Sequence, residues 1–239
     1  MSFLAIISAL LGWIYTILWS LSFYPQAILM YRNKTAAGFS LDFAHLNFLG
    51  FVCYTLFNLS FLLSTTVQQQ YRDRHHGSAN VVRWNDAVFA LHALALTAFQ
   101  VVQVWWYPRE SGQRISRFAR LSMAGIAVAV LGAVLLVLPD GGRTRNDQWP
   151  PGNRKSKAIF SLQYLDLVNL FSYIKLYITL VKYLPQVLLN RQRKSTKGFS
   201  IEAILLDFAG GVLSLLQLVI DAGLIEHDWT GVTGDFGKL

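Results

Sequence analysis

The chain has 239 residues, of which 54% are hydrophobic, 14% aromatic and only 14% charged. Soluble domains carry about 25% charged residues, so this composition excludes a soluble globular enzyme. One cysteine, Cys53, excludes both a disulfide scaffold and a cysteine-based zinc cluster. The net charge of +8 does not indicate nucleic acid, because nearly all Lys and Arg residues lie in short hydrophilic segments between apolar ones. We expect a membrane protein with no enzymatic activity, cofactor or metal.

Long uncharged segments predict helices that cross a bilayer. Four segments lack Lys, Arg, Asp and Glu altogether: 1–31, 43–71, 87–108 and 121–139. A span needs about 20 apolar residues, and in lipid an open structure satisfies its backbone only as a helix. In chain order we predict spans at 3–23, 42–63, 86–106, 120–138, 165–189 and 203–223. The predicted connections are 24–41, 64–85, 107–119, 139–164 and 190–202, of which the fourth is a polar loop.

The basic residues do not fix the orientation of these helices. Loops one, three and five, with one helix edge, hold ten Lys and Arg residues, and the loops on the other side, with the tail, hold nine. The positive-inside rule needs a clear excess on one side. The first helix lacks the basic start of a signal peptide, so we expect it to be retained as a span.

The chain repeats itself at an offset of 160 residues. Ten of the 27 aligned pairs between 24–50 and 184–210 are identical, among them Gly-Phe-Ser at 38–40 and 198–200. The repeats start at the first and fifth helices, so both copies cross the membrane in the same direction. Parallel repeats are one of the two symmetries of transporters, whose substrate sites lie near the midplane. An old duplication in another membrane protein would leave the same pattern, but we favour transport.

Two Pro-Gln pairs stand at equivalent points of the repeats, Pro25-Gln26 and Pro185-Gln186. Proline removes a helix hydrogen bond and clashes with the preceding turn, so each helix is predicted to kink or end there. A kink lets the two ends of a helix move separately, and we interpret the four residues as gating hinges. A lone proline would more simply end a helix at the membrane edge.

Charged residues within apolar segments indicate a functional site. Lys175 and Lys182 lie seven residues apart in the fifth segment, which places them on one face of a continuous helix. A charge at the bilayer centre costs about 2.5–3.5 kcal/mol, so it usually faces a cavity and a partner. The alternative is that the lysines extend to the membrane interface, and this alternative is stronger for Lys182, three residues before Pro185.

The sixth segment adds an acid, Asp207, whose repeat partner in the second segment is Asn47. Asp207 shares a helix face with small and polar residues, including Gly210 and Gly211. Close helix packing explains these glycines as well as function does. Elsewhere in apolar segments His45 and His92 stand singly, so we expect them to be hydrogen-bonded structural residues rather than metal ligands.

Four segments resemble the cystinosins: WSLSFYPQ at 19–26, FSYIKL at 171–176, TLVKYLPQ at 179–186 and LLDFAGG at 205–211. Cystinosins are proton-coupled exporters of cystine from lysosomes, in the PQ-loop family that is related to the SWEET sugar transporters. The similarity runs from about Gly12 to Leu239. It implies an all-α integral membrane bundle of two parallel triple-helix repeats joined by a linker helix. It also implies a lysosomal or vacuolar membrane, a luminal amino terminus and Pro-Gln loops that face the cytosol.

The resemblance has two departures. The family has a seventh helix after the segment that matches 234–239, so we expect six of seven helices here. This divides the chain into a first bundle with the first Pro-Gln motif (1–106), a linker helix and polar loop (107–164) and an incomplete second bundle (165–239). We expect either weak transport or stabilisation by a partner chain. In addition, the family has Asn where this chain has Ala203, which removes one substrate hydrogen bond.

Cystine is a double zwitterion, so its site needs cations for the carboxylates and acids or amides for the ammonium groups. The resemblance assigns substrate binding to five matched residues: Asn47, Lys175, Lys182, Tyr183 and Asp207. Trp19 and Phe23, near the first Pro-Gln, are candidate walls of the site, although bare aromatic residues often anchor a helix at the membrane interface.

The resemblance assigns proton coupling to Asp86, and we add Asp207 as a second candidate. Without the resemblance, Asp86 would be interpreted as an acid favoured at a helix amino terminus. The expected function is proton-coupled export of L-cystine. The alternatives are a PQ-loop exporter of another cationic or neutral amino acid, and a membrane receptor or sorting protein on the same scaffold.

Overall fold

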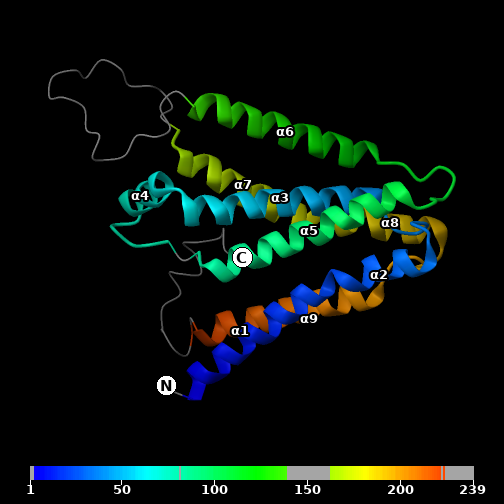
Figure 1. Cartoon of the computed structure of the whole chain (residues 1–239), viewed down its shortest axis with the longest axis horizontal. Coiled ribbons are helices and arrows are strands. Elements are labelled where there is room, and N and C mark those ends of the chain that lie inside the picture. Colours follow the sequence, from blue (N-terminus) through cyan, green and yellow to red (C-terminus); the bar gives the residue numbers. More distant parts are fainter. Residues whose placement is uncertain (1–2, 81, 139–161, 222, 224–239) are drawn as a thin grey trace. The chain divides into compact units, whose positions relative to one another are not determined.

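The computed structural model describes residues 3–80, 82–138, 162–221 and 223, and its regular elements are helices throughout these ranges (Figure 1). Their bounds are α1 Phe3–Ser22, α2 Tyr24–Asn33, α3 Leu41–Leu63, α4 Thr65–Arg74, α5 Trp84–Trp106, α6 Arg117–Val137, α7 Tyr164–Val181, α8 Tyr183–Arg193 and α9 Ile201–Ile220.

Six stretches of the described chain are long and apolar enough to cross a membrane. They are Phe3–Asn33, Leu41–Leu63, Trp84–Trp106, Arg117–Val137, Tyr164–Arg193 and Ile201–Ile220. Each contains or overlaps one of the six predicted spans. The prediction of an all-helical, multi-pass membrane protein is therefore confirmed.

Two of the predicted connections contain helices that hydropathy did not indicate. The stretch after the first span forms α2, and α4 lies within the connection 64–85. The fifth predicted span, which was expected to end at residue 189, continues as α8 to Arg193. The polar helices α2 and α4 each bury one face, which includes Met30 in α2 and Tyr71 in α4. This burial stabilises a helix whose average hydropathy resembles that of a loop.

Serine side chains begin four of the helices. Each accepts a hydrogen bond from the backbone N–H three residues later, and the four are Ser40, Ser64, Ser116 and Ser200. A serine at this position satisfies one of the backbone donors that a helix start leaves free, which contributes about 1 kcal/mol. Ser40 and Ser200 are the last residues of the two Gly-Phe-Ser sequences, so the repeat also specifies where α3 and α9 begin.

The chain forms two compact units, which alternate along the sequence. The first comprises 1–48, 92–114 and 182–239, and the second comprises 49–91 and 115–181. Both α3 and α5 contribute residues to each unit. The predicted division into 1–106, 107–164 and 165–239 follows chain order and stays a prediction.

In the first unit, α1 lies antiparallel to α9 (Figure 1). Near one end of the pair, the indole Nε1 of Trp19 donates to the backbone oxygen of Asp207 at 3.2 Å. Further along, the amide Nε2 of Gln217 donates to the backbone oxygen of Ser8 at 3.0 Å. Polar side chains thus join the two helices at two separated points, as is common between membrane helices.

In the second unit, α4 is fastened to the start of α7. Arg74 forms an ion pair with Asp166, and it donates to the side-chain oxygen of Gln163 through Nε and Nη2. The side-chain oxygen of Gln70 also accepts from the backbone of Leu165 at 3.0 Å. These contacts hold a short amphipathic helix against the end of a span.

Two predictions concern residues that the structure does not describe. The polar loop expected at 139–164 lies outside the described residues except for its last three positions. The segment 234–239, after which the family has its seventh helix, also lies outside the described residues.

Candidate functional site

Both Pro-Gln motifs lie just after an interruption of a membrane helix. The break between α1 and α2 falls at Phe23, two residues before Pro25, and the break between α7 and α8 falls at Lys182, three residues before Pro185. The backbone at Phe23 and Lys182 keeps helical angles, so the helices are interrupted without turning back. Proline has no backbone N–H to donate to the preceding turn, which accounts for such breaks. The predicted interruptions are therefore present, and the role of these residues as hinges stays a prediction.

Lys182 occupies the second of these breaks, where it is only 7% exposed. Its Nζ donates to the side-chain oxygen of Asn47 at 3.3 Å. The ammonium also lies 4.9 Å from the ring centre of Tyr183 and 5.8 Å from that of Phe43. An amide oxygen and two aromatic faces thus surround the charge, as a cation inside a membrane requires.

Asp207 is held by two aromatic side chains. The hydroxyl of Tyr183 donates to its Oδ2, and the indole of Trp19 donates to its backbone oxygen. Trp19 lies directly against Gly210, where an added Cβ would stand 2.5 Å from the indole Cδ1. Gly210 therefore has a definite packing role, because any larger residue would displace Trp19.

Five of the predicted substrate residues meet in the first unit: Trp19, Asn47, Lys182, Tyr183 and Asp207. Two of these contacts are linked through the backbone, because Lys182, which bonds to Asn47, and Tyr183, which bonds to Asp207, are adjacent in sequence. The cluster offers a cation, an amide, a carboxylate and aromatic surface within one compact unit. These groups suit a zwitterion, and their role in binding stays a prediction.

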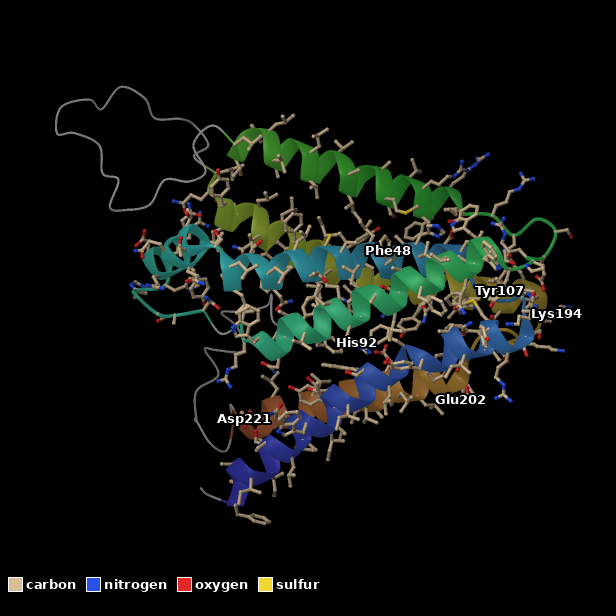
Figure 2. The ribbon with its side chains drawn as sticks, in the orientation of Figure 1. Phe48, His92, Tyr107, Lys194, Glu202 and Asp221 are labelled. Atoms are coloured by element: carbon tan, nitrogen blue, oxygen red, sulfur yellow. The ribbon has the colours of Figure 1, made fainter. Side chains whose placement is uncertain are left out.

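Phe23, the other predicted wall residue, is buried and packs against His92 with ring centres 6.3 Å apart. Figure 2 shows His92 on α5 with its side chain toward α2. The hydroxyl of Tyr24 contacts the His92 Nε2 at 2.8 Å, so this histidine is hydrogen-bonded as predicted. His45 is likewise bonded, because its Nδ1 lies 2.7 Å from the Leu41 oxygen and its Nε2 accepts from Trp105 at 3.0 Å.

Lys175 belongs to the second unit. Its Nζ donates to the hydroxyl of Thr179 at 3.2 Å and lies 4.1 Å from the ring centre of Phe51. The prediction that Lys175 and Lys182 share one helical face assumed a continuous helix. α7 ends at Val181 and Lys182 precedes α8, but the backbone at Lys182 keeps helical angles. That the two lysines share one face therefore stays a prediction.

Asp86 lies in the first turn of α5, also in the second unit. Its Oδ2 accepts from the backbone N–H of Arg83 at 2.8 Å, and its own N–H donates to the Arg83 oxygen at 3.1 Å. The bond from the Arg83 N–H to the Asp86 side chain is one half of a capping box. The structure therefore gives Asp86 a capping role, and proton coupling stays a prediction from the resemblance.

The two Pro-Gln glutamines exchange hydrogen bonds with the opposite repeat. Gln26 donates to the Gly198 oxygen at 3.2 Å and accepts from the Ser200 N–H at 2.8 Å. Gln186 donates to the Gly38 oxygen at 2.9 Å and accepts from the Ser40 N–H at 2.7 Å. Both glutamine side chains are buried. We refer to these four bonds as the glutamine clamp.

The clamp brings the two Gly-Phe-Ser sequences into direct contact. Phe39 stacks on Phe199 with ring centres 6.1 Å apart. Gly38 and Gly198 have positive φ angles of 84° and 100°, and an added Cβ at either would collide with the backbone of the other loop. Glycine is therefore required in both repeats. Sequence reasoning identified the motif but missed the exchange, because a repeat shows which residues are equivalent and not which ones meet.

Two further glutamines support the first break and were missed. Gln100 and Gln103, three residues apart on α5, donate to the backbone oxygens of Phe23 at 2.9 Å and Ala27 at 3.0 Å. These acceptors lie on either side of Pro25. Two amides on one face of an uncharged span were the available signal, since buried amides in lipid need partners.

Comparison with known proteins places both repeats in one family. The PQ loop repeat family matches residues 7–67 and 167–226, which confirms the internal repeat at an offset of 160. The cystinosin homolog of Dictyostelium discoideum is 40% identical over all of this chain, which covers 76% of that relative.

Two further relatives are a cystinosin and a cystine transporter. The cystinosin of Drosophila melanogaster is 38% identical over 97% of this chain, which spans only 53% of that relative's length. The cystine transporter of Saccharomyces cerevisiae is 29% identical over 88% of this chain and is covered to 77%. The family match in both halves, with 40% identity over three quarters of a cystinosin homolog, shows that the chain belongs to the cystinosins of the PQ-loop family.

Proposed function

We propose that the chain exports L-cystine from the lumen of a lysosome or vacuole to the cytosol, coupled to protons. The observation that carries the proposal is the pair of adjacent contacts in the first unit, Lys182 with Asn47 and Tyr183 with Asp207. Relatives named cystinosin and cystine transporter support cystine as the substrate. The amino terminus would be luminal and the glutamine clamp would lie toward the cytosol.

In this proposal each polar group of the cluster recognises one part of the substrate. The Lys182 ammonium binds a carboxylate of cystine, and the Asp207 carboxylate binds an ammonium group. Asn47 and Tyr183, which hold these charges without substrate, exchange their bonds for bonds to cystine. Trp19 provides an aromatic wall for the apolar disulfide. Lys175 joins them from the resemblance, and Phe23 from its place near the first Pro-Gln.

Proton coupling requires an acid that loads from the luminal side and releases toward the cytosol. We assign this role to Asp86 and Asp207, the acids that the resemblance and the cluster supply. Asp207 has the more direct coupling, since a proton on its carboxyl group would weaken its attraction for an ammonium group. Substrate and proton would then compete for, or alternate at, one carboxylate.

Access to the cytosol requires that the clamp open. Its four hydrogen bonds join backbone of one repeat to side chains of the other, so separating the two Gly-Phe-Ser sequences breaks all four together. The breaks at Phe23 and Lys182 allow α2 and α8 to move without the rest of their spans. In this proposal, the arrangement with all four bonds formed is the closed form of the gate.

Uptake by purified protein in liposomes tests the proposal. In liposomes where the amino terminus faces outward, radiolabelled L-cystine should accumulate faster when the outside is acidic, and a protonophore should abolish the difference. Equal or faster uptake of a cationic or neutral amino acid would favour an exporter of another substrate. Saturable cystine binding without any flux would favour a receptor, and neither binding nor flux would overturn cystine as the ligand.

A further inference from the structure

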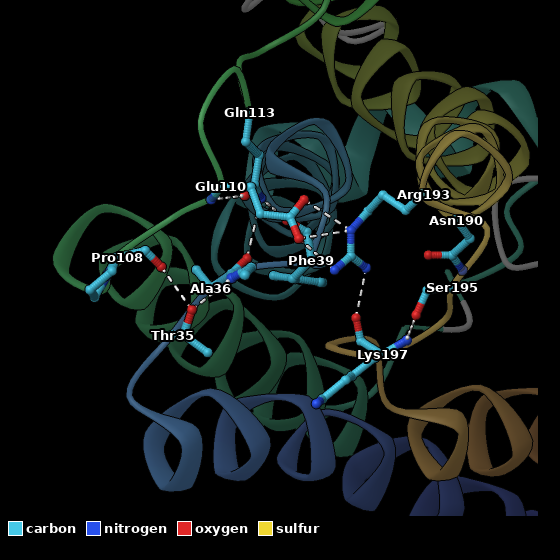
Figure 3. A network of polar contacts seen from close by, with 12 residues as sticks. Thr35, Ala36, Phe39, Pro108, Glu110, Gln113, Asn190, Arg193, Ser195 and Lys197 are labelled. Carbon is cyan, nitrogen blue, oxygen red and sulfur yellow. Dashed lines mark hydrogen bonds and ion pairs between the residues drawn. The ribbon is translucent and has the colours of Figure 1, made fainter.

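The loop between α5 and α6 lies against the loop between α2 and α3, which carries the first Gly-Phe-Ser sequence. Backbone Pro108 O accepts hydrogen bonds from the Ala36 N–H at 2.9 Å and the Thr35 hydroxyl at 3.0 Å. The amide Nε2 of Gln113 donates to the backbone oxygens of Ala36 at 3.2 Å and Phe39 at 2.6 Å. We refer to residues 108–113 as the strap. These contacts, drawn in Figure 3, attach it to the first repeat.

A single ion pair attaches the strap to the second repeat, within the residues that Figure 3 draws. Glu110 accepts from Arg193 in a fork, with Nε at 3.0 and 2.9 Å from the two carboxylate oxygens and Nη2 at 2.6 Å from Oε1. Paired N–H donors on a planar carboxylate are the strongest geometry for such a pair. Arg193 is the last residue of α8, so this contact connects the strap to the helix that begins at Lys182.

Arg193 also fills the junction between the two loops. Its Nη1 donates to the backbone oxygen of Lys197 at 2.7 Å, in the second repeat. The same nitrogen lies 2.6 Å from where a Cβ of Gly38 would stand, in the first repeat. One guanidinium therefore touches the strap and both Gly-Phe-Ser loops. Separating the loops requires Arg193 to leave at least one of these partners.

The ion pair of Arg193 with Glu110 has good geometry but is partly exposed to water. The side chains of Arg193 and Glu110 are 19% and 40% exposed, so water competes for both charges. Ion pairs with this degree of exposure contribute modestly, unlike the buried glutamine bonds beside them. A weak, partly exposed ion pair beside the buried glutamine clamp is suited to set how often the clamp opens.

We infer that Glu110 and Arg193 act as positioning residues of the gate: their ion pair latches the strap over the closed clamp. Opening then requires three events together, namely loss of the ion pair, release of the strap and separation of the loops. The inference relies on the proposed function only where it treats this opening as a step of transport. The chain would tune its turnover through this pair without contact with the substrate.

Labelling of a cysteine beneath the strap tests the latch directly. Cys53 is the only native cysteine and is buried, so Cys53→Ala gives a clean background. Ala36 is 1% exposed and bonded to the strap, so Ala36→Cys reports when the strap lifts. In this background Glu110→Gln and Arg193→Gln should each raise the rate of maleimide labelling roughly two- to fivefold, the range expected of one such ion pair.

The double variant Glu110→Gln with Arg193→Gln identifies the pair as the cause. It should label no faster than the faster single variant, because both substitutions break the same contact. Two matched controls should leave the labelling rate unchanged. Arg191→Gln removes an exposed charge from the same helix, and Arg74→Gln breaks a similar ion pair, that with Asp166 in the second unit.

Unchanged labelling in both single variants, or independent effects that multiply in the double variant, would overturn the latch. Loss of thermal stability without faster labelling would show that the pair is merely structural, and would overturn it too. The labelling rate does not depend on transport of cystine. A chain that carries no cystine but shows the predicted labelling would contradict the proposed function and leave the latch intact.

Discussion

A lysine within a membrane span needs polar or aromatic partners in place of the water that it loses. Lys182 has them in Asn47, Tyr183 and Phe43. The alternative from sequence, an ammonium extended to the interface, does not fit a side chain that is 7% exposed. The hydrogen bond that holds Lys182 is to a neutral amide, and its charge also interacts with that of Asp207.

Lys182→Met should reduce cystine uptake at least tenfold while the protein still reaches the membrane. Met keeps the length and apolar stem of the side chain but removes the charge and the bond to Asn47. Lys175→Met should have a similar effect if the role implied by the resemblance is right. Uptake normalised to surface protein measures both, with Arg191→Gln as a control for loss of one positive charge. Normal uptake in either variant would end its assignment as a substrate ligand.

Two neighbouring glycines of α9 provide a matched pair. Gly210→Ala places a Cβ 2.5 Å from the Trp19 ring, whereas at Gly211 an added Cβ meets no atom within 4 Å. Overpacking costs about 1–3 kcal/mol, and Ala is favoured over Gly in a helix by about 1 kcal/mol. Gly210→Ala should therefore lower the melting temperature and weaken cystine uptake, while Gly211→Ala should be neutral or stabilising. Equal effects would mean that Trp19 does not rest on Gly210.

Asp86→Asn separates the two interpretations of Asp86. Asn can still accept the Arg83 N–H bond, so the helix cap and the stability of the fold should survive. Asn cannot take up a proton, so the dependence of uptake on the proton gradient should disappear. Uptake measured with and without a gradient, alongside thermal unfolding, distinguishes the roles. If gradient dependence persists in Asp86→Asn, Asp86 is a capping residue and nothing more.

At the scale of elements, the interruptions at the Pro-Gln motifs were predictable and the short polar helices were not. Proline lacks the N–H that a helix needs, and this local rule holds wherever Pro25 and Pro185 stand. Helix α2 depends instead on burial of Gln26, Ala27 and Met30. That burial comes from tertiary packing, which the polarity of residues 24–33 did not reveal.

The glutamine clamp yields a prediction for α8. Gln186→Leu removes two bonds to the first repeat and leaves the Gly38 oxygen and the Ser40 N–H unsatisfied, each at about 1–3 kcal/mol. It should lower the melting temperature by several degrees and increase labelling of Ala36→Cys. Gln192→Leu, at an exposed position of the same helix, should change neither. A melting temperature equal to the parent's in Gln186→Leu would mean that the clamp contributes nothing to the closed form.

For the chain taken together, composition and the internal repeat were sufficient to predict a helical, multi-pass protein with two parallel repeats, and the resemblance added the PQ-loop family. The residue types of the candidate site were also predictable, since Lys182 and Asp207 stand out in apolar segments. The contacts that these residues make were not predictable. The contact of Lys182 with Asn47 joins positions 135 residues apart, and the ion pair of Glu110 with Arg193 joins a loop to the end of α8, which share no motif. Such pairs depend on how helices pack, which the sequence pattern alone does not specify.

In the proposed mechanism, Lys182 recognises a carboxylate and Asp207 an ammonium group of cystine. Modified ligands pair each residue with one group of the substrate. N,N′-diacetylcystine lacks both ammonium groups, and cystine dimethyl ester lacks both carboxylates. The test is equilibrium binding of these ligands and of cystine to the parent, Lys182→Met and Asp207→Asn proteins.

Each substitution should weaken cystine binding at least tenfold. Asp207→Asn should not weaken binding of diacetylcystine further, and Lys182→Met should not weaken binding of the dimethyl ester further, because the partner group is already absent. If both variants weaken all three ligands by the same factor, or if both bind cystine as the parent does, these residues do not recognise the charges of cystine.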